Sequence, residues 1–187
     1  MTVRQRTDGL MPLPVVLVLA SGRGERFALS GGTTHKLQAM LKDKTVLQHT
    51  LDTVRASGLP WHLEQAAHPG MGDSIAAAAR ATPDAPGWLV LPADLPLLQP
   101  DTLRVVARAL QDHDVVVPVV HGQRGHPVGF SAACGPALRA LQGAHGAASV
   151  IRAFDTLLLA HGDIGCITDI DTVADLEAAR KRMENRA

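Results

Sequence analysis

The sequence predicts an α/β protein built on a mostly parallel sheet. Short apolar runs bounded by glycine and proline alternate with segments of helical periodicity, which is the pattern of successive βα units. The chain has 187 residues, of which 46% are hydrophobic, so it can bury one sizeable core but not two. We therefore expect one domain over residues 13–187, preceded by a disordered leader over residues 1–12.

The first half of the chain predicts a central strand and two helices. The continuous apolar run at 15–20 indicates a strand that is buried on both faces. Apolar residues recur at helical spacing over 45–57 and stop at Gly58, a typical helix end. A second helix begins in "GDSIAAAARA", where either Asp73 or Ser74 is expected to cap it.

The second half predicts further units of the same kind. "GWLVLPADLP" reads as a strand that ends in a loop, and Pro100 begins the helix that follows it. The final helix over 172–183 begins with a capping box formed by Thr172 and Asp175. The remaining strands are expected in "DVVVPVV", "HPVGF", "TLLLA" and "GCITDID", and short helices in "PALRALQ" and "SVIRAF".

Composition excludes several classes of function. Lys and Arg together number 18, as do Asp and Glu, so no net field attracts nucleic acid or an acidic membrane surface. The longest apolar run, "PLPVVLVLA", is far shorter than the roughly 20 residues that cross a bilayer. Cys134 and Cys166 lack the spacing of a zinc or redox site, which favours a reducing compartment, the cytoplasm.

A glycine-rich turn, "LASGRGERF", follows the first strand directly. Glycines allow the backbone to approach phosphate oxygens, and the arginines supply positive charge, although such a turn can also be a plain tight connection. The spacing matches neither the dinucleotide fingerprint nor the P-loop. The residues expected to bind the nucleotide here are Leu19, Ala20, Ser21, Gly22, Arg23 and Gly24.

A single acidic residue, Asp94, lies just past a second buried strand, in "LPADLP". A carboxylate in this place suits a hard cation such as Mg²⁺, although Asp beside proline is also common in turns. A phosphate-binding loop and a metal-binding carboxylate at two strand ends are the minimum needed for chemistry on a nucleoside triphosphate.

Five motifs, in order along the chain, make the sequence similar to the nucleotidyltransferases of the molybdopterin group. They are "LASGRGERF" with "HKL", "HPGMGDSI", "LPADLP", "GHPVGF" and "DIDTVADL". Together they run from Leu19 to Leu176 and most resemble the molybdenum cofactor cytidylyltransferase subgroup. The resemblance implies a three-layer, Rossmann-like nucleotidyltransferase fold.

The resemblance also implies roles for charged residues. Arg26 and Lys36 would steady the triphosphate, and Asp94 would bind Mg²⁺. In a last strand, Asp169 and Asp171 would lie on one face, so either could complete the metal site. We favour Asp171, for which the alternative role is a cap on the final helix.

Two further motifs are expected to contact the substrates. Gly70, Met71 and Ser74 would offer backbone donors and a hydroxyl to the base or ribose, unless they only cap the helix. His126 and Pro127, in "GHPV", would contact the pterin, although a turn histidine without a role is equally consistent with this position.

These features predict the transfer of CMP from CTP to the phosphate of molybdopterin, with Mg²⁺ as cofactor and pyrophosphate as product. A phosphate acceptor is already ionised, so charge cancellation rather than a general base is required. One alternative is a transferase that uses GTP or another acceptor, such as a sugar phosphate. Another is a catalytically inactive nucleotide-binding accessory protein that delivers the cofactor to a molybdoenzyme partner.

Three departures from the family pattern bear on these expectations. The segment 58–70 is too short for the usual strand, helix and strand, so one βα unit is missing and Trp61 and Leu63 would form the inward face of a single strand. Ala144 and Ala148 replace an acid and an arginine expected on the acceptor side. A longer spacer before Lys36 predicts a mobile loop that engages only once ligand binds.

Overall fold

The computed structural model describes residues 12–185, so the expected leader lies almost wholly outside the described residues. A seven-stranded sheet has the order β4-β1-β5-β8-β6-β7, with β9 also paired to β6. The strands are β1 (Val15–Leu19), β4 (Trp61–Glu64), β5 (Gly87–Pro92), β6 (Val115–Val120), β7 (Gln123–Arg124), β8 (Val128–Ser131) and β9 (Thr156–Ala160). Strands β4, β1 and β5 are parallel, as are β6 and β9, whereas β8 is antiparallel to both β5 and β6.

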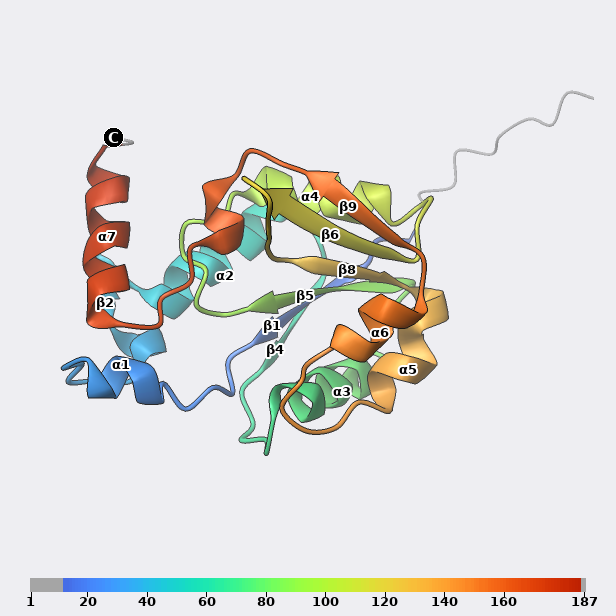
Figure 1. Cartoon of the computed structure of the whole chain (residues 1–187), viewed down its shortest axis with the longest axis horizontal. Coiled ribbons are helices and arrows are strands. Elements are labelled where there is room, and N and C mark those ends of the chain that lie inside the picture. Colours follow the sequence, from blue (N-terminus) through green and yellow to red (C-terminus); the bar gives the residue numbers. More distant parts are fainter. Residues whose placement is uncertain (1–11, 186–187) are drawn as a thin grey trace, which may run out of the picture.

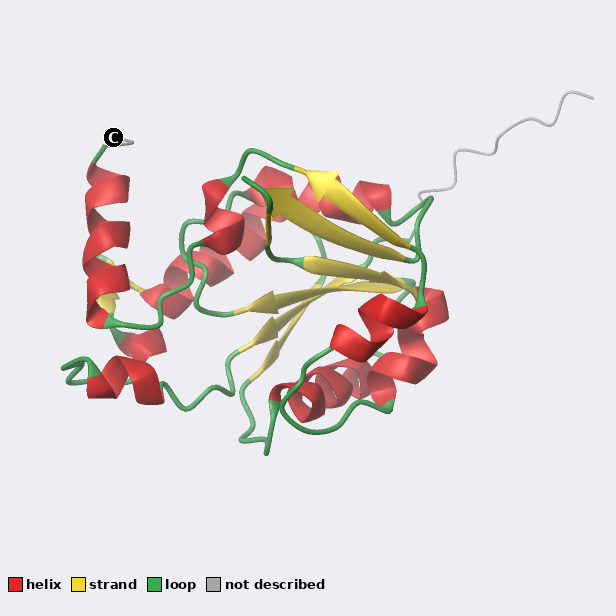
Figure 2. Cartoon of the chain, viewed as in Figure 1, coloured by secondary structure: helices red, strands yellow, loops and turns green. Residues whose placement is uncertain are grey.

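Helices cover both faces of this sheet and make the expected three layers (Figures 1 and 2). The helices are α1 (Glu25–Leu29), α2 (Val46–Ser57), α3 (Met71–Ala81), α4 (Pro100–Ala109), α5 (Gly135–Arg139), α6 (Ala148–Ala153) and α7 (Val173–Glu184). Short 3-10 turns are η1 (Lys36–Gln38), η2 (Ala132–Cys134) and η3 (Ile164–Ile167), and β2 (Met40–Leu41) pairs with β3 (Lys44–Thr45). The mostly parallel, layered α/β prediction is confirmed.

Alternation along the strands divides the core into two clusters. Val16 and Val18 of β1 face a cluster that includes apolar residues of α2, α4 and α7. Leu17 and Leu19 face the opposite cluster, with residues of α3, α5 and α6. A continuous apolar strand is needed because both faces of β1 are covered.

The ends of α2 and α7 agree with the sequence prediction, whereas the start of α3 does not. Helix α2 begins with a capping box formed by Thr45 and Gln48 and ends at Gly58, whose φ is 73°. Helix α7 begins with the predicted capping box of Thr172 and Asp175. The prediction of a side-chain cap on α3 is wrong, because Gly70 is its N-cap and no side chain bonds there.

The segment "GCITDID" is not a strand, which corrects the prediction. Residues 164–167 form η3 instead, and Asp163 caps this turn by accepting a hydrogen bond from Gly165 N. Gly165 also packs so closely on Leu97 that an added Cβ would lie 2.4 Å from its carbonyl oxygen. Close backbone packing therefore replaces strand pairing here.

A single edge strand, β4, connects α2 to α3, as the short segment predicts. Leu63 packs against the core cluster beneath α2. Trp61 does not, because 39% of it is exposed and the guanidinium of Arg55 lies 5.6 Å from its ring centroid. The inward-face prediction is correct for Leu63 and wrong for Trp61.

Parallel pairing brings the ends of β1 and β5 together. Leu19 pairs with Pro92 in register, and Ala93 N donates to Leu19 O at 3.0 Å. The turn after β5 is joined to the segment after η3 by a hydrogen bond from Ile170 N to Asp94 O, also 3.0 Å. Three loops distant in sequence thus share one edge of the sheet.

Within residues 12–185, no helix has the length and apolar character to cross a membrane.

Candidate functional site

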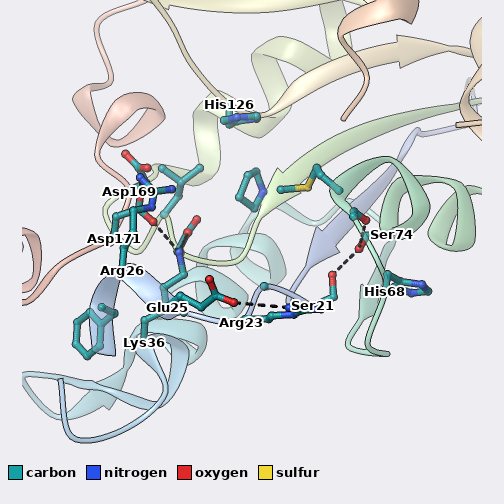
Figure 3. Close-up of a pocket in the computed structure, with 18 of the residues that line it drawn as sticks. Ser21, Arg23, Glu25, Arg26, Lys36, His68, Ser74, His126, Asp169 and Asp171 are labelled. Atoms are coloured by element: carbon teal, nitrogen blue, oxygen red, sulfur yellow. Dashed lines mark hydrogen bonds and ion pairs between the residues drawn. The ribbon is translucent and has the colours of Figure 1, made fainter. Parts of the chain in front are cut away.

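A cavity of about 690 Å³ lies at this edge of the sheet (Figure 3). Its walls come from the loop after β1 with α1, the start of α3, the turn after β5, β7 and the segment that follows η3. In Figure 3, Arg26, Lys36 and Asp171 lie together on one side, and Ser21, Ser74 and His68 lie on the other. The cavity is large enough for a nucleotide-sized ligand.

The ammonium of Lys36 joins two acidic residues from distant parts of the chain. Its Nζ lies 2.6 Å from Asp94 Oδ2 and 2.9 Å from Asp171 Oδ1. Arg26 Nη1 contacts the other oxygen of Asp171 at 2.7 Å. The side chain of Lys36 is 12% exposed and that of Arg26 is 76% exposed, so one cation is held inside and the other at the rim.

The surroundings of Lys36, Asp171 and Asp169 shift the pKa of each of these side chains. Burial lowers the pKa of Lys36, but its bonds to Asp94 and Asp171 outweigh this and leave the pKa above its ordinary value. Burial raises the pKa of Asp171, but Lys36 and then Arg26 outweigh that and hold the pKa below its usual range. Burial, and then the neighbouring carboxylates Asp171 and Asp94, raise the pKa of Asp169.

The turn that carries Lys36 is joined to the glycine-rich loop through His35. His35 N-caps η1 by accepting from Leu37 N at its Nδ1, and its Nε2 lies 2.8 Å from Gly22 O. Because Nδ1 accepts, Nε2 must carry the proton that it donates to Gly22 O. His35 therefore fastens the lysine turn to the glycine-rich loop, a role that the sequence left open.

The two carboxylate oxygens of Asp94 differ in their surroundings, since Oδ2 accepts from Lys36 Nζ and Oδ1 does not. Its Oδ1 is buried and has no hydrogen-bond partner among residues 12–185. No cluster of three or more His, Cys, Asp or Glu in that part of the chain could enclose a metal ion. The carboxylates of Asp94 and Asp171 both line the cavity, where Lys36 Nζ contacts each of them.

The opposite wall is formed by the start of α3. Ser74 Oγ lies 2.5 Å from Ser21 Oγ, which links this wall to the glycine-rich loop. Gly70 is required here, because an added Cβ would lie 2.4 Å from the backbone of Gly143. The predicted grouping of Gly70, Met71 and Ser74 around one ligand space is therefore present in the fold.

Two residues near this wall, His68 and Glu64, have no role predicted from the sequence. His68 lines the cavity, and its Nε2 lies 3.2 Å from Oε1 of Glu64, which is nearly buried. Burial raises the pKa of Glu64, but bonds from Ala66 N and His68 outweigh this and hold it low. The pairing depends on the turn between the two residues, whose conformation the motif "HPGMGDSI" beginning at His68 does not specify.

The third wall carries His126 and Cys166. His126 Nδ1 is buried without a partner among the described residues, and burial lowers the pKa of this histidine against the opposing effect of Asp94. The imidazole is therefore neutral at pH 7. Burial raises the pKa of the Cys166 thiol to about 12, so Cys166 is not a nucleophile.

Not all of the predicted residues reach the cavity. Leu19, Ala20 and Pro127 do not line it, and the side chain of Leu19 is buried in the core. The predicted residues that do line it are Ser21, Gly22, Arg23, Gly24, Arg26, Lys36, Gly70, Met71, Ser74, Asp94, His126 and Asp171. Asp169, left as the alternative to Asp171, lines it as well.

Ala144 lies in the loop that packs against the start of α3, and Ala148 is the first residue of α6. Gly72 N donates to Gly143 O at 2.8 Å, and Asp73 Oδ2 accepts from Gly143 N. Neither alanine lines the cavity, and the loop is beside Gly70 rather than beside His126. The expectation that these positions serve the acceptor side stays a prediction.

Comparison with known families gives one match over more than half of the chain. The model of the MobA-like NTP transferase domain matches residues 54–157. A 26-residue segment is also 73% identical to YagP of Escherichia coli (strain K12), which is named for a LysR family substrate binding domain. That match spans 14% of this chain and 19% of YagP, so it says little about the function of either.

Solved structures share the fold over nearly the whole chain. Rv0371c from Mycobacterium tuberculosis H37Rv has a TM-score of 0.76 and 24% identity, over 91% of this chain and 98% of its own; it is also known as a manganese complex. A nucleotidyl transferase from Methanothermobacter thermautotroptrophicus has a TM-score of 0.76 and 17% identity, over 94% of this chain and 99% of its own. Molybdopterin-guanine dinucleotide biosynthesis protein A from Archaeoglobus fulgidus has a TM-score of 0.66 and 17% identity, over 91% of this chain and 99% of its own.

Proposed function

The chain belongs to the MobA-like NTP transferase family and is a nucleotidyltransferase, and from this we propose that it transfers CMP from CTP to the phosphate of molybdopterin. The observation that carries the proposal is the meeting of Lys36, Asp94 and Asp171 in one cavity with the glycine-rich loop. We further place the enzyme in the cytoplasm, since both cysteines are buried, free thiols that suit a reducing compartment.

The reaction joins two anions, so its main obstacle is repulsion. An oxygen of the acceptor phosphate forms a bond to the α-phosphorus of CTP while the bond to pyrophosphate breaks, and the electron pair leaves with pyrophosphate. Lys36 and Arg26 neutralise the triphosphate, and the backbone at Gly22 and Gly24 allows close approach. No proton has to be removed from the acceptor, because a phosphate monoester is largely ionised near pH 7.

The carboxylates suit a divalent cation, and we assign Mg²⁺ to them. Asp94, through its unpartnered Oδ1, and Asp171 would hold the ion. When bound, Mg²⁺ supplies charge cancellation between the phosphate oxygens. The manganese complex of Rv0371c supports a divalent cation in this fold.

The choice of CTP rests on the sequence motifs and on the α3 wall. This wall offers hydrogen-bond donors and acceptors that suit the edge of a small base. They come from Ser74, from the backbone near Gly70 and from His68. One observation favours a second candidate, a GTP-using transferase, since a structural relative is named for a guanine dinucleotide product. Both candidates share the same catalytic residues.

Incubation with each of the four labelled nucleoside triphosphates, Mg²⁺ and molybdopterin tests the proposal. Pyrophosphate release with CTP alone is the expected result. Release with GTP or only with a sugar phosphate as acceptor would replace the proposal by the other transferase. Nucleotide binding without turnover would instead indicate an inactive accessory protein for a molybdoenzyme.

Replacing Gly22 by Ala should weaken triphosphate binding without disturbing the fold. No atom lies within 4 Å of an added Cβ, so the melting temperature without nucleotide should stay unchanged. The methyl group would face the phosphates, and KM for CTP should rise about tenfold or more. Steady-state kinetics and thermal unfolding measure the two effects.

Gly162→Ala is the matched control, because Gly162 also has free space around it and does not line the cavity. It should leave KM unchanged. A normal KM for CTP in Gly22→Ala would show that the phosphates do not approach this loop.

A further inference from the structure

Arg124, in β7, stands out among the charged residues that line the cavity. Arg124 is exposed, and its side chain has no hydrogen-bond or ion-pair partner within residues 12–185. The three other arginine and lysine side chains of the lining all contact acidic groups: Arg23 contacts Glu25, Arg26 contacts Asp171, and Lys36 contacts both Asp94 and Asp171. Among the lining cations of residues 12–185, Arg124 is thus the one whose side chain has no acidic partner.

The backbone around Arg124 is firmly held. Arg124 pairs with Val119 of β6, and Gly125 N donates to Pro118 O at 2.8 Å. His126 N donates to Cys166 O at 2.9 Å, and an added Cβ on Gly125 would lie 2.6 Å from that same oxygen. Arg124 is therefore carried by a fixed backbone at the wall of the cavity, which favours a positioned ligand over a freely moving surface charge.

The location of Arg124 separates it from the triphosphate-binding groups. Arg26 and Lys36 come from the chain after β1, whereas Arg124 comes from the segment that also carries His126. The first group already faces the two metal-binding carboxylates. The second offers an unpaired cation together with the buried, unpartnered Nδ1 of His126.

On the basis of the proposed function, we propose that Arg124 binds the phosphate of the acceptor. A planar guanidinium donates two parallel hydrogen bonds to phosphate oxygens, and it leaves a third oxygen free to attack. The acceptor phosphate carries a charge near −2, which must be brought beside a triphosphate. Arg124 would counter that charge without competing for the groups that hold CTP.

Arg124→Gln should raise KM for molybdopterin roughly 10- to 100-fold at saturating CTP and Mg²⁺. The increase in melting temperature caused by CTP and Mg²⁺ should stay at its wild-type value. Arg124→Lys should recover part of the loss, because lysine restores the charge without the paired geometry. Arg152→Gln, which changes an exposed arginine of α6 outside the cavity, should change neither quantity.

Equilibrium binding of molybdopterin, followed by its fluorescence, separates this inference from the proposed reaction. If the wild type turns over and Arg124→Gln keeps a normal KM and Kd for molybdopterin, the role of Arg124 is overturned and the reaction stands. If the wild type binds molybdopterin through Arg124 without turnover, the reaction fails and the inference stands. Loss of the CTP-induced stabilisation in Arg124→Gln, or no molybdopterin binding by the wild type, would overturn the inference.

Discussion

Asp94→Asn is expected to lower kcat by about three orders of magnitude or more while the protein still folds. The substitution keeps the shape of the side chain but removes the charge that faces both Lys36 and the metal position. Lys36 keeps its bond to Asp171, so the melting temperature should fall by only a few degrees, about 2–6 °C. Pyrophosphate release and thermal unfolding measure the two effects.

Asp52→Asn is the control for this result. Asp52 also forms ion pairs, with Lys44 and Arg55, but these are exposed and lie outside the cavity. Its loss should leave kcat at the wild-type value and change stability little, since exposed ion pairs contribute little. Wild-type turnover by Asp94→Asn with Mg²⁺ would show that Asp94 does not hold the cation.

Lys36→Met should lower kcat by roughly 100- to 1,000-fold and also destabilise the protein. Methionine keeps most of the apolar stem but leaves Asp94 and Asp171 facing each other without the ammonium. A loss of about 2 kcal/mol corresponds to a melting temperature lower by roughly 4–8 °C. Mg²⁺ alone should recover more stability in this variant than in the wild type, because it can replace the missing charge.

The stability lost in Lys36→Met should depend on pH in a defined way. The pKa of Lys36 is raised above 10.5, so its contribution is complete below pH 10.5 and is lost as pH rises through the folded value. The pKa of Asp171 is lowered below 3.8, so its contribution is complete above pH 3.8 and is lost as pH falls through the folded value. The difference in the free energy of unfolding between Lys36→Met and the wild type should therefore be largest between pH 3.8 and pH 10.5.

Lys44→Met controls for the loss of a lysine ion pair elsewhere, since Lys44 pairs with Asp52 at an exposed position. It should keep kcat and nearly all of the stability. A turnover number of Lys36→Met equal to that of the wild type would rule out charge cancellation by Lys36.

Local patterns predicted the elements whose energetics are local. The strand at 15–20, the helix after Thr45 and the capping box at Thr172 follow from apolar periodicity and from hydrogen bonds within a few residues. The edge of the sheet that carries Asp94 was also predictable, because parallel strands bring their carboxyl ends together.

Contacts between distant segments could not be predicted from such patterns. Residues 165–171 were predicted as a strand, but Gly165 packs on Leu97 and residues 164–167 form a 3-10 turn instead. The position of Lys36 depends on the bond between His35 and Gly22. The contact of His68 with Glu64 and the place of Arg124 in the cavity wall depend on how their turns fold. Each of these features requires the tertiary arrangement.

The measurement that tests the central claim most directly is a crystal structure with a non-hydrolysable CTP analogue and Mn²⁺, located by its anomalous scattering. We expect the triphosphate against the loop at 21–26 and Lys36, with manganese bound by the carboxylates of Asp94 and Asp171. A triphosphate bound outside the cavity that these residues line, or manganese bound away from Asp94, would contradict the account.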